Sequence, residues 1–215
     1  MSKQPLSDYK EFRKVLKEAQ NIVVLTGAGV SAESGIPVFR GVGGLWRTHR
    51  ATDLATLEAF KTNPALVWEF YHYRRDIAFN SYPNTAHKAL ALYEKICKEQ
   101  GRKFCIITQN VDGLHRKAGS ENVLELHGSL QKVICTKCKQ IEINMQNPIC
   151  EALRGRGDPN EEQDLPVIPV DDLPKCTKCQ SLVRPYIVWF GENLDPDVLN
   201  KSSKGNLYKL AICVS

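Results

Sequence analysis

Several features are absent from this sequence, and each absence excludes a class of protein. The longest apolar runs fall far short of the roughly 20 residues that a membrane-spanning helix requires. The N-terminal stretch, MSKQPLSDYKEF, lacks the apolar core of a signal peptide and is too acidic for a transit peptide, so no presequence is visible. No internal repeat is visible either. We therefore expect no membrane partner.

A strong charge imbalance is also absent. The chain carries 29 Lys and Arg residues against 24 Asp and Glu residues, a formal net charge of +5. Most of the basic residues are scattered along the faces of predicted helices. This mild excess fits a preference for acidic ligands but does not indicate nucleic-acid binding.

The composition that is present is typical of a globular domain. With 42% hydrophobic and 25% charged residues, the 215-residue chain can form one core and a small satellite module. Of its eight cysteines, four lie in two C-x-x-C pairs. In a chain with no visible secretory signal, such pairs indicate metal ligands more than disulfides.

The stretch 21–40 organises the rest of the sequence. Ile22–Leu25 is an unbroken apolar run, which predicts a strand buried on both faces of a parallel sheet. The next residues form a G-x-G-x-x-A turn into a helix, whose free N–H groups would face phosphates. Gly27 allows the tight turn, Gly29 lets a phosphate approach, and small Ala32 lets the helix pack on the sheet. An ordinary strand–helix turn can have the same pattern, so this signal alone is weak.

A loop follows this turn where a usual dinucleotide-binding domain would continue its helix. Ser34–Pro37 contains Gly and Pro, which should end any helix within a turn or two. The next residues, Phe39–Gly44, place an aromatic and a cation beside the phosphate site. We expect a variant pocket in which this loop covers the cofactor.

Periodicity and caps predict the remaining elements. Helices are expected at Ser7–Gln20, from Asn63 to about Ala78, and at Thr85–Gln100; strands are expected at Lys103–Thr108, Val123–Leu126, Val183–Phe190 and Leu210–Val214. Alternating helices and buried strands indicate an α/β fold with a Rossmann-like, doubly wound parallel sheet. We divide the chain into a Rossmann-like first part at 1–132, a metal-binding module at 133–183, and a return to the Rossmann-like part at 184–215.

The two cysteine pairs predict one structural zinc ion. Cys135 and Cys138 form one pair, and Cys176 and Cys179 form the other. Two such pairs give four thiolates in a tetrahedron, with no open position for a substrate. Two disulfides or a redox C-x-x-C are the alternatives. The polar insert between the pairs, 155–164, is expected to be mobile.

Polar residues follow the predicted strands. Gln109, Asn110 and Asp112 come after the second strand, and His127 comes after the third. Ligands of open α/β sheets bind outside the carboxyl ends of the strands, where Gly27 also lies. Asn110 and Asp112 could instead cap the next helix, and His127 could be a surface residue. The convergence of three strand ends favours a site, and histidine suits proton transfer near neutral pH.

These stretches together resemble the sirtuin family of NAD-dependent protein deacylases. They occur in family order and reach to about Pro196: GAGVSAESGIPVFRG (27–41), TQNVDGLH (108–115), ELHGS (125–129), both C-x-x-C pairs, and VWFGE (188–192). The resemblance implies that NAD is consumed as a co-substrate. The acyl oxygen of a modified lysine attacks the ribose carbon as nicotinamide leaves, and the products are nicotinamide, free lysine and O-acyl-ADP-ribose.

The resemblance also implies roles for single residues. His127 is implied to be the catalytic base that takes a proton from a ribose hydroxyl, and Gln109 to orient that ribose. The backbone of Val188, Trp189, Phe190 and Gly191 is implied to pair with the substrate peptide as an added strand. The residues implied to contact NAD are Gly27, Ala28, Gly29, Val30, Ser31, Ala32, Glu33, Phe39, Arg40, Trp46, Gln109, Asn110, Val111 and Asp112.

Three further residues look like those of the sirtuin-5-like branch, which removes acidic acyl groups (succinyl, malonyl, glutaryl) from lysine. Tyr71 and Arg74 are one helical turn apart, so a hydroxyl and a guanidinium would point together and could bind a carboxylate. Small Ala51 would leave room for the longer acyl chain. Alternatively, Arg74 pairs with a nearby acid such as Asp76 or Glu69, and we expect Arg75 to be a surface residue of that kind.

The similarity fades after Pro196. Gly205 interrupts a polar stretch where the family continues a helix, and the chain stops at Ser215, where the family has a second Gly/Ser loop. Gly113 also replaces an acid expected in this branch. We therefore expect a truncated chain with weakened NAD binding. The alternatives are a catalytically inactive isoform acting as a zinc-containing binding module and, less favoured, a zinc-ribbon nucleic-acid binder, which would need a dense basic face.

The resemblance places the protein in mitochondria, with cytosolic and nuclear pools as further options. Its implied partners are acylated lysine side chains of proteins, and we expect a monomer that binds no nucleic acid.

Overall fold

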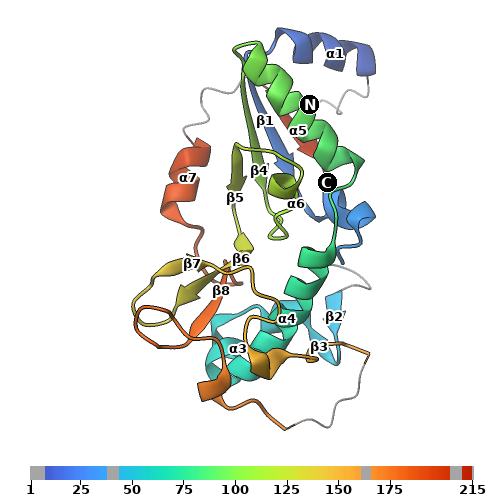
Figure 1. The fold of residues 1–215 in the computed structure, drawn as a ribbon. Coiled ribbons are helices and arrows are strands. Elements are labelled where there is room, and N and C mark those ends of the chain that lie inside the picture. Colours follow the sequence, from blue (N-terminus) through green and yellow to red (C-terminus); the bar gives the residue numbers. More distant parts are fainter. Residues whose placement is uncertain (1–7, 38–43, 161–165, 204–209, 215) are drawn as a thin grey trace.

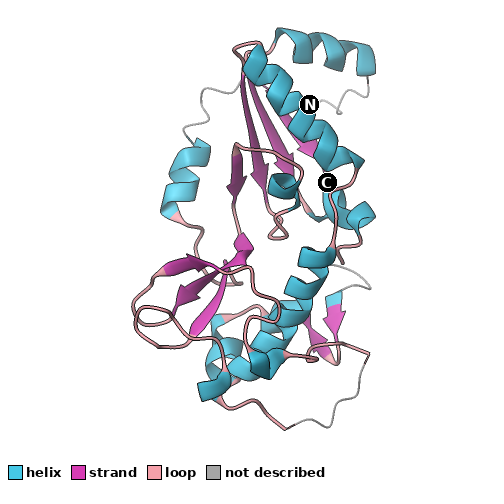
Figure 2. Cartoon of the chain, in the orientation of Figure 1, coloured by secondary structure: helices cyan, strands magenta, loops and turns pink. Residues whose placement is uncertain are grey.

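A computed structural model of the protein describes residues 8–37, 44–160, 166–203 and 210–214. Figure 1 shows a parallel sheet with its helices at one end of the molecule and a smaller sheet packed near helices α3 and α4 at the other. Figure 2 shows the strands gathered into separate groups. The predicted α/β fold with a satellite module is therefore confirmed.

The larger sheet has four parallel strands in the order β5–β4–β1–β9. These strands are β1 (Asn21–Thr26), β4 (Lys103–Thr108), β5 (Val123–Glu125) and β9 (Leu210–Val214). β1 pairs with β4 in register, from Asn21 opposite Lys103 to Thr26 opposite Thr108. The carboxyl ends of these strands therefore lie at one edge of the sheet, as predicted.

The helices begin and end at the residues that cap them. Asn63 accepts a hydrogen bond from Leu66 N at the start of α4, and Gly101 has a φ of 70° just after α5. The helices are α1 (Tyr9–Glu18), α2 (Ala51–Leu54), α3 (Leu57–Thr62), α4 (Pro64–Asn80), α5 (Thr85–Glu99), α6 (Leu114–Lys117) and α7 (Pro196–Ser203), with 3₁₀ turns η1 (Ala28–Ser34), η3 (Glu151–Leu153) and η4 (Val170–Asp172).

β1 is less buried than predicted. Ile22 and Val24 are buried, but Val23 and Leu25 are only half-buried. α5 covers one face of the sheet, where Cys97 packs into the same cluster as Ile22 and Val24. On the other face of the sheet, to which Val23 and Leu25 point, the described residues leave these side chains half-buried. The expectation of a strand buried on both faces is wrong for this reason.

The glycine-rich turn also differs from the prediction. η1 is a short 3₁₀ segment that ends at Gly35, whose φ of 81° is left-handed. Ala32 is exposed, so it does not pack a helix against the sheet as expected. The buried residues of η1 are Val30 and Ser31. A Gly35-Ile36-Pro37 sequence stops the segment before a longer helix can form.

The smaller sheet is antiparallel, in the order β7–β6–β8. Its strands are β6 (Gly128–Cys135), β7 (Ile141–Ile143) and β8 (Val183–Ile187). The expected return to the parallel sheet after residue 183 is therefore wrong for β8, which pairs with β6. The short strands β2 (Leu45–Trp46) and β3 (His49–Arg50) form a separate hairpin.

The start of the polar insert is held in place. Trp46 Nε1 donates to the Gly157 carbonyl over 2.8 Å, and Arg156 forms an ion pair with Glu69 at 3.4 Å. Residues 161–165 of the insert lie outside the described part of the chain. The predicted mobility of the insert therefore does not extend to Arg156 and Gly157.

None of the helices in the described residues is long and apolar enough to cross a membrane.

The four paired cysteines meet at the end of the smaller sheet. All four Sγ atoms lie within 4.8 Å of one another, with Cys135–Cys179 at 3.4 Å and Cys138–Cys176 at 3.7 Å. None of the four is in a disulfide. A tetrahedral zinc with bonds of about 2.3 Å separates its sulfurs by about 3.8 Å, so this cluster fits one zinc ion.

We predict that zinc binding stabilises the fold. Because a structural metal contributes its binding energy to folding, Cys176→Ser should release zinc and lower the free energy of unfolding by about 4 kcal/mol or more. Metal content by mass spectrometry and urea unfolding would measure both effects. Cys150→Ser is the matched control, because Cys150 lies outside the cluster and should leave the zinc in place. Equal metal loss in both variants would contradict the assignment.

Candidate active site

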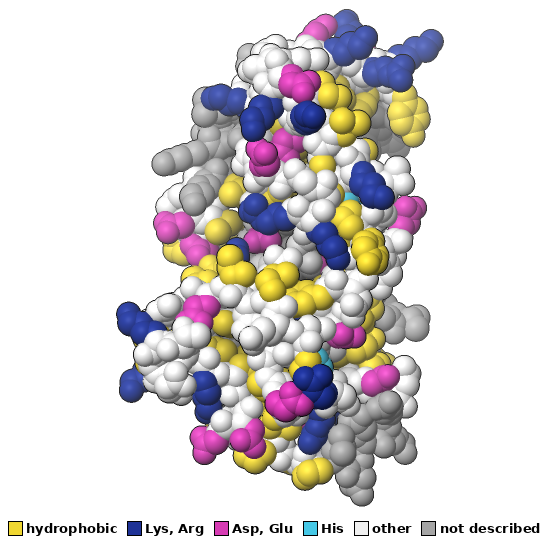
Figure 3. All heavy atoms as spheres, viewed as in Figure 1, with side chains coloured by type: hydrophobic (Ala, Val, Ile, Leu, Met, Phe, Trp, Pro, Cys, Tyr) yellow, Lys and Arg dark blue, Asp and Glu magenta, His cyan; other side chains and the backbone are white. Residues whose placement is uncertain are grey.

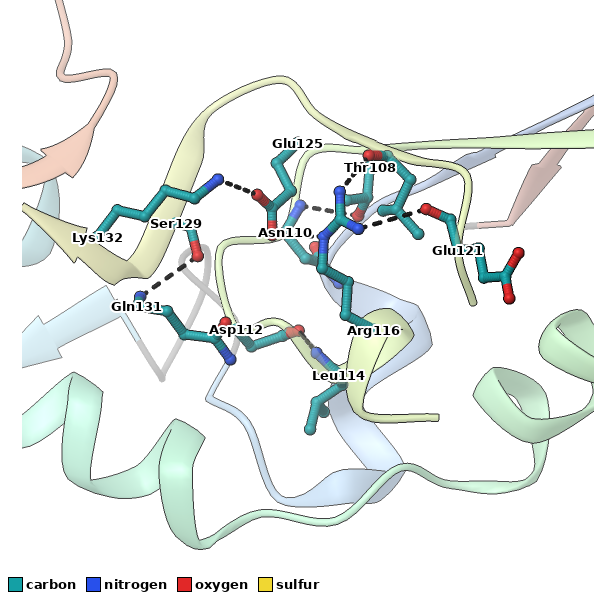
Figure 4. A network of polar contacts seen from close by, with 11 residues as sticks. Thr108, Asn110, Asp112, Leu114, Arg116, Glu121, Glu125, Ser129, Gln131 and Lys132 are labelled. Atoms are coloured by element: carbon teal, nitrogen blue, oxygen red, sulfur yellow. Dashed lines mark hydrogen bonds and ion pairs between the residues drawn. The ribbon is translucent and has the colours of Figure 1, made fainter. Parts of the chain in front are cut away.

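Two residues of the predicted cofactor site, Asn110 and Asp112, contact the hydroxyl of a third, Ser31. Asn110 Nδ2 donates to Ser31 Oγ over 3.0 Å, and Ser31 Oγ donates to Asp112 Oδ2 over 2.8 Å. Ser31 lies in η1 after β1, whereas Asn110 and Asp112 follow β4, among the polar side chains in Figure 4. The structure therefore brings these side chains together at the carboxyl ends of two strands.

Asp112 has both of the roles that the sequence left open. Its Oδ1 accepts the N–H of Leu114, the first residue of α6, over 2.8 Å, although Gly113 is the N-cap residue; its Oδ2 accepts the Ser31 hydroxyl. Asn110 does not cap the helix, because its side chain donates to Ser31. A narrow hollow with no room for a water molecule adjoins Asn110 and Asp112, and Thr108 and Glu125 also line it. In Figure 4 Lys132 points to Glu125 beside this hollow.

Two buried histidines support this network, and the sequence analysis missed both. His115 Nε2 lies 2.9 Å from Thr26 Oγ1, and His87 Nε2 lies 3.4 Å from Ser31 Oγ. The two rings are 4.8 Å apart. Asn84 caps α5, bonds to His87 Nδ1 and donates to the Val30 carbonyl. A histidine on the apolar stripe of a predicted helix was the available signal for His87.

A backbone contact of His127 fixes which of its two ring nitrogens carries the proton. Its Nδ1 lies 3.0 Å from the Gln109 carbonyl. A carbonyl only accepts, so Nδ1 carries the proton in the neutral ring, and Nε2 keeps its lone pair. Among the described residues Nε2 has no hydrogen-bond partner. Gly128, directly after, has a φ of 83°, and any Cβ there would collide with the Tyr186 carbonyl of β8.

A second group of predicted residues lies along α4. Tyr71 is buried, and its hydroxyl accepts the Trp189 indole N–H over 2.8 Å. Arg74 lies one turn later, with its guanidinium 5.6 Å from the Phe70 ring centroid. Burial lowers the pKa of Arg74 to about 10, which leaves it charged near neutral pH, and Tyr71 and Asp112 are close enough to oppose that shift. Arg74 is therefore close enough to Tyr71 and to Asp112 for their charges to act on it.

The acids named as alternative partners of Arg74 have other partners. Glu69 pairs with Arg47 at 2.8 Å and with Arg156 at 3.4 Å. Asp76 accepts hydrogen bonds from the side chains of Asn80 and Asn147. The contacts that the structure gives for these two carboxylates are therefore with residues other than Arg74.

Arg75 is not the surface residue that was expected. It is 1% exposed, and its guanidinium donates to the backbone carbonyls of Leu130, Asn144 and Gln146. Burial lowers the pKa of Arg75 to about 10. The expectation was wrong because α4 is covered on this side by β6 and by the segment after β7.

The predicted peptide-binding stretch is tied into the fold. Val188 N donates to the His127 carbonyl and Phe190 N to the Ala55 carbonyl, both over 3.0 Å. Trp189 N donates to Glu192 Oε2 over 2.9 Å. These three backbone amides are therefore engaged within the chain, and Gly191, the last residue of the stretch, has a φ of 86°.

The remaining predicted residues are spread more widely. Ala28, Gly29 and Glu33 are exposed on η1, whereas Ala51 and Trp46 are buried in the core around α4. Val111 is half-buried against that core. The predicted Phe39 and Arg40 lie outside the described residues.

Gly113, the departure from the family pattern, has a structural reason. Its φ of 76° favours glycine, and an added Cβ would press on the Gln131 side chain.

The buried histidines predict a pH-dependent stability. Burial and, next, His87 lower the pKa of His115 to about 4, and burial lowers the pKa of His87. An unfolded histidine titrates near 6.5, so below that pH the unfolded state binds more protons than the folded state. We expect the free energy of unfolding to fall as the pH drops from about 6.5 to 5. Each histidine contributes up to about 1.4 kcal/mol per pH unit. Urea unfolding of the wild type and His115→Asn measures the slope, and an unchanged slope in the variant would contradict this origin.

Comparison with known proteins identifies close relatives. Residues 27–215 match the Sir2 family. An NAD-dependent protein deacylase of Daphnia pulex is 55% identical over 202 residues, which cover 93% of this chain and 74% of that protein. The mitochondrial NAD-dependent protein deacylase sirtuin-5 of Canis lupus familiaris is 51% identical over 211 residues, 97% of this chain and 67% of that protein.

The fold agrees with these relatives. The solved structure of a Sir2 homolog–NAD complex matches with a TM-score of 0.80 and 41% identity, covering 99% of this chain and 74% of that chain. Sequence and fold thus agree over nearly all of the chain. The chain belongs to the Sir2 family.

Proposed function

We propose that this chain, an NAD-dependent protein deacylase, removes acidic acyl groups (succinyl, malonyl or glutaryl) from the lysine side chains of proteins. The deacylase activity follows from its family and from relatives that are about 50% identical to it in sequence. The acidic acyl class rests on one observation: Tyr71 and Arg74 lie one turn apart on α4, close enough for each to affect the pKa of the other. A carboxylate is the ligand that a buried cation and a hydroxyl donor together would bind.

The position of this pair supports the proposal. Asp112 is near enough to raise the pKa of Arg74. Asp112 also accepts a hydrogen bond from Ser31, which lies with Asn110 at the carboxyl ends of the strands. An acyl chain whose carboxylate binds Arg74 would therefore have its lysine end close to Ser31 and Asp112. Ala51, which is small and buried in the same cluster as Tyr71, would leave space for the chain.

The strand-end residues fit NAD. A Cβ added at Gly27 would meet nothing within 4 Å, and Ala28 and Gly29 are exposed, so a phosphate can approach this backbone. We assign the pyrophosphate to the stretch 27–31 and the nicotinamide carboxamide to Asn110 and Asp112. Bound NAD supplies an electrophilic ribose carbon from which nicotinamide departs.

His127 would act as the base toward a ribose hydroxyl. The Gln109 carbonyl holds its Nδ1–H, so the lone pair of Nε2 is available to take the proton. The Val188 N–H binds the His127 carbonyl and fixes the backbone on the other side. Gln109, whose backbone carbonyl holds this ring and whose side chain is exposed, would orient the ribose.

No observation among the described residues favours an inactive zinc-containing binding module. A nucleic-acid role has no support on the face in Figure 3, where Lys and Arg side chains alternate with Asp and Glu. Mitochondrial localisation is our proposal from the name of the sirtuin-5 relative. The monomeric state stays a prediction.

Replacing Arg74 tests the acyl class. We expect Arg74→Met to lower kcat/KM for a succinyl-lysine peptide by about 10–100-fold, because a charge-assisted bond to the carboxylate is worth about 1.5–3 kcal/mol. Activity on an acetyl-lysine peptide, which has no carboxylate, should change much less. Mass spectrometry of both peptides with NAD measures the two rates. Arg13→Met on the exposed face of α1 is the control for charge loss. Equal loss on both peptides would rule out carboxylate recognition by Arg74.

Replacing His127 tests the base. We expect His127→Tyr to lower kcat by about 10²–10⁴-fold on every acyl peptide, since general-base catalysis contributes about that much. Zinc content should stay unchanged, because the four residues clustered to bind zinc are all cysteines and do not include His127. Turnover near the wild-type rate in a folded, zinc-loaded variant would remove His127 from this role.

A further inference from the structure

The Trp189 side chain packs against the aromatic rings of Phe60 and Tyr71. It is 2% exposed, and its ring centroid lies 5.3 Å from that of Phe60 and 6.1 Å from that of Tyr71. Substrate contact was expected only from the backbone of this residue. Its indole nitrogen has a separate contact, over 2.8 Å, with the Tyr71 hydroxyl.

This contact fixes the direction of one hydrogen bond. An indole N–H is a donor only, so the Tyr71 oxygen must accept it. The hydroxyl proton of Tyr71 is then left for another partner, and among the described residues the structure gives it none. Burial raises the pKa of Tyr71 to about 12, so the hydroxyl keeps that proton near neutral pH.

The indole is itself held on two sides. The Arg184 guanidinium lies 4.3 Å from the centroid of the Trp189 ring. Arg184 also pairs with Glu192 at 2.7 Å, and Glu192 accepts the Trp189 backbone N–H over 2.9 Å. These contacts fix both the ring and the backbone of Trp189, so the indole N–H has one direction available.

We propose that Trp189 is a positioning residue that determines acyl specificity: its indole N–H makes the Tyr71 hydroxyl a hydrogen-bond donor. Tyr71 and Arg74 can then both donate to one ligand group, and a carboxylate accepts from both. A hydroxyl without the tryptophan could also rotate to accept a hydrogen bond from a neutral carboxamide. This inference rests on the proposed acidic acyl class and names the residue that enforces it.

Peptide binding tests the proposal without requiring turnover. One labelled peptide carries succinyl-lysine, and a matched peptide carries the terminal carboxamide of the same chain length. Fluorescence anisotropy gives the Kd of each for the full chain. We expect Trp189→Phe to reduce the preference for carboxylate over carboxamide about tenfold, which is about 1.4 kcal/mol.

A double-mutant cycle separates positioning from general loss of packing. In a Tyr71→Phe background, Trp189→Phe should change the preference by less than about twofold, because the hydroxyl through which it acts is gone. Trp68→Phe is the matched control: it removes another buried indole N–H, which donates to the Val183 carbonyl over 3.0 Å. That variant should leave the preference unchanged, even if it lowers stability.

An NMR measurement tests the hydrogen bond directly. The chain has three tryptophans, so three indole N–H signals are expected. In Tyr71→Phe the signal of Trp189 should shift, while those of Trp46 and Trp68, which donate to backbone carbonyls, should stay. An unshifted Trp189 signal would overturn the proposal.

The possible failures are distinguishable. If the wild type shows no preference for the succinyl peptide, the proposed acyl class is wrong, and the specificity role is wrong with it. If the wild type prefers the carboxylate and Trp189→Phe keeps that preference, only the role of Trp189 is overturned. An equal effect of Trp189→Phe in both backgrounds would likewise show that it does not act through Tyr71.

Discussion

The in-register parallel pairing of β1 with β4 is the constraint on which the site depends. Thr26 lies opposite Thr108, so the chain leaves both strands at the same edge of the sheet. Gln109 N then bonds to the Thr26 carbonyl, and the segments that follow meet where Ser31 bonds to Asp112. A shift of one residue in this pairing would turn alternate side chains to the opposite face and separate these groups.

A second constraint joins the sheet edge to the zinc-binding end of the molecule. α4 carries Tyr71 and Arg74, and the buried Arg75 fastens this helix to carbonyls of β6 and of the segment after β7. β6 begins directly after His127. One buried guanidinium therefore fixes the helix that carries Tyr71 and Arg74 relative to the strand that follows His127. The zinc cluster includes Cys135, which lies at the opposite end of β6 from His127.

Much of the fold and part of the site could be predicted because their signals are local. A C-x-x-C pair, an Asn-Pro helix start and an apolar run between polar turns depend on neighbours in sequence. The burial of Val23 and Leu25, the partner strand of β8 and the burial of Arg75 depend on what packs against them. Sequence periodicity carries no information on that, and these predictions failed.

By itself the sequence determined the zinc ligands, the strands whose ends carry polar residues, and the one-turn spacing of Tyr71 and Arg74, since each follows from covalent spacing and backbone geometry. Only the tertiary structure decided that His87 and His115 support Ser31 and Thr26, and that Trp189 donates to Tyr71. The two residues of that last pair are 118 positions apart in the chain. Such contacts form only when separate elements pack, because hydrogen-bond direction depends on distances and angles that no local pattern specifies.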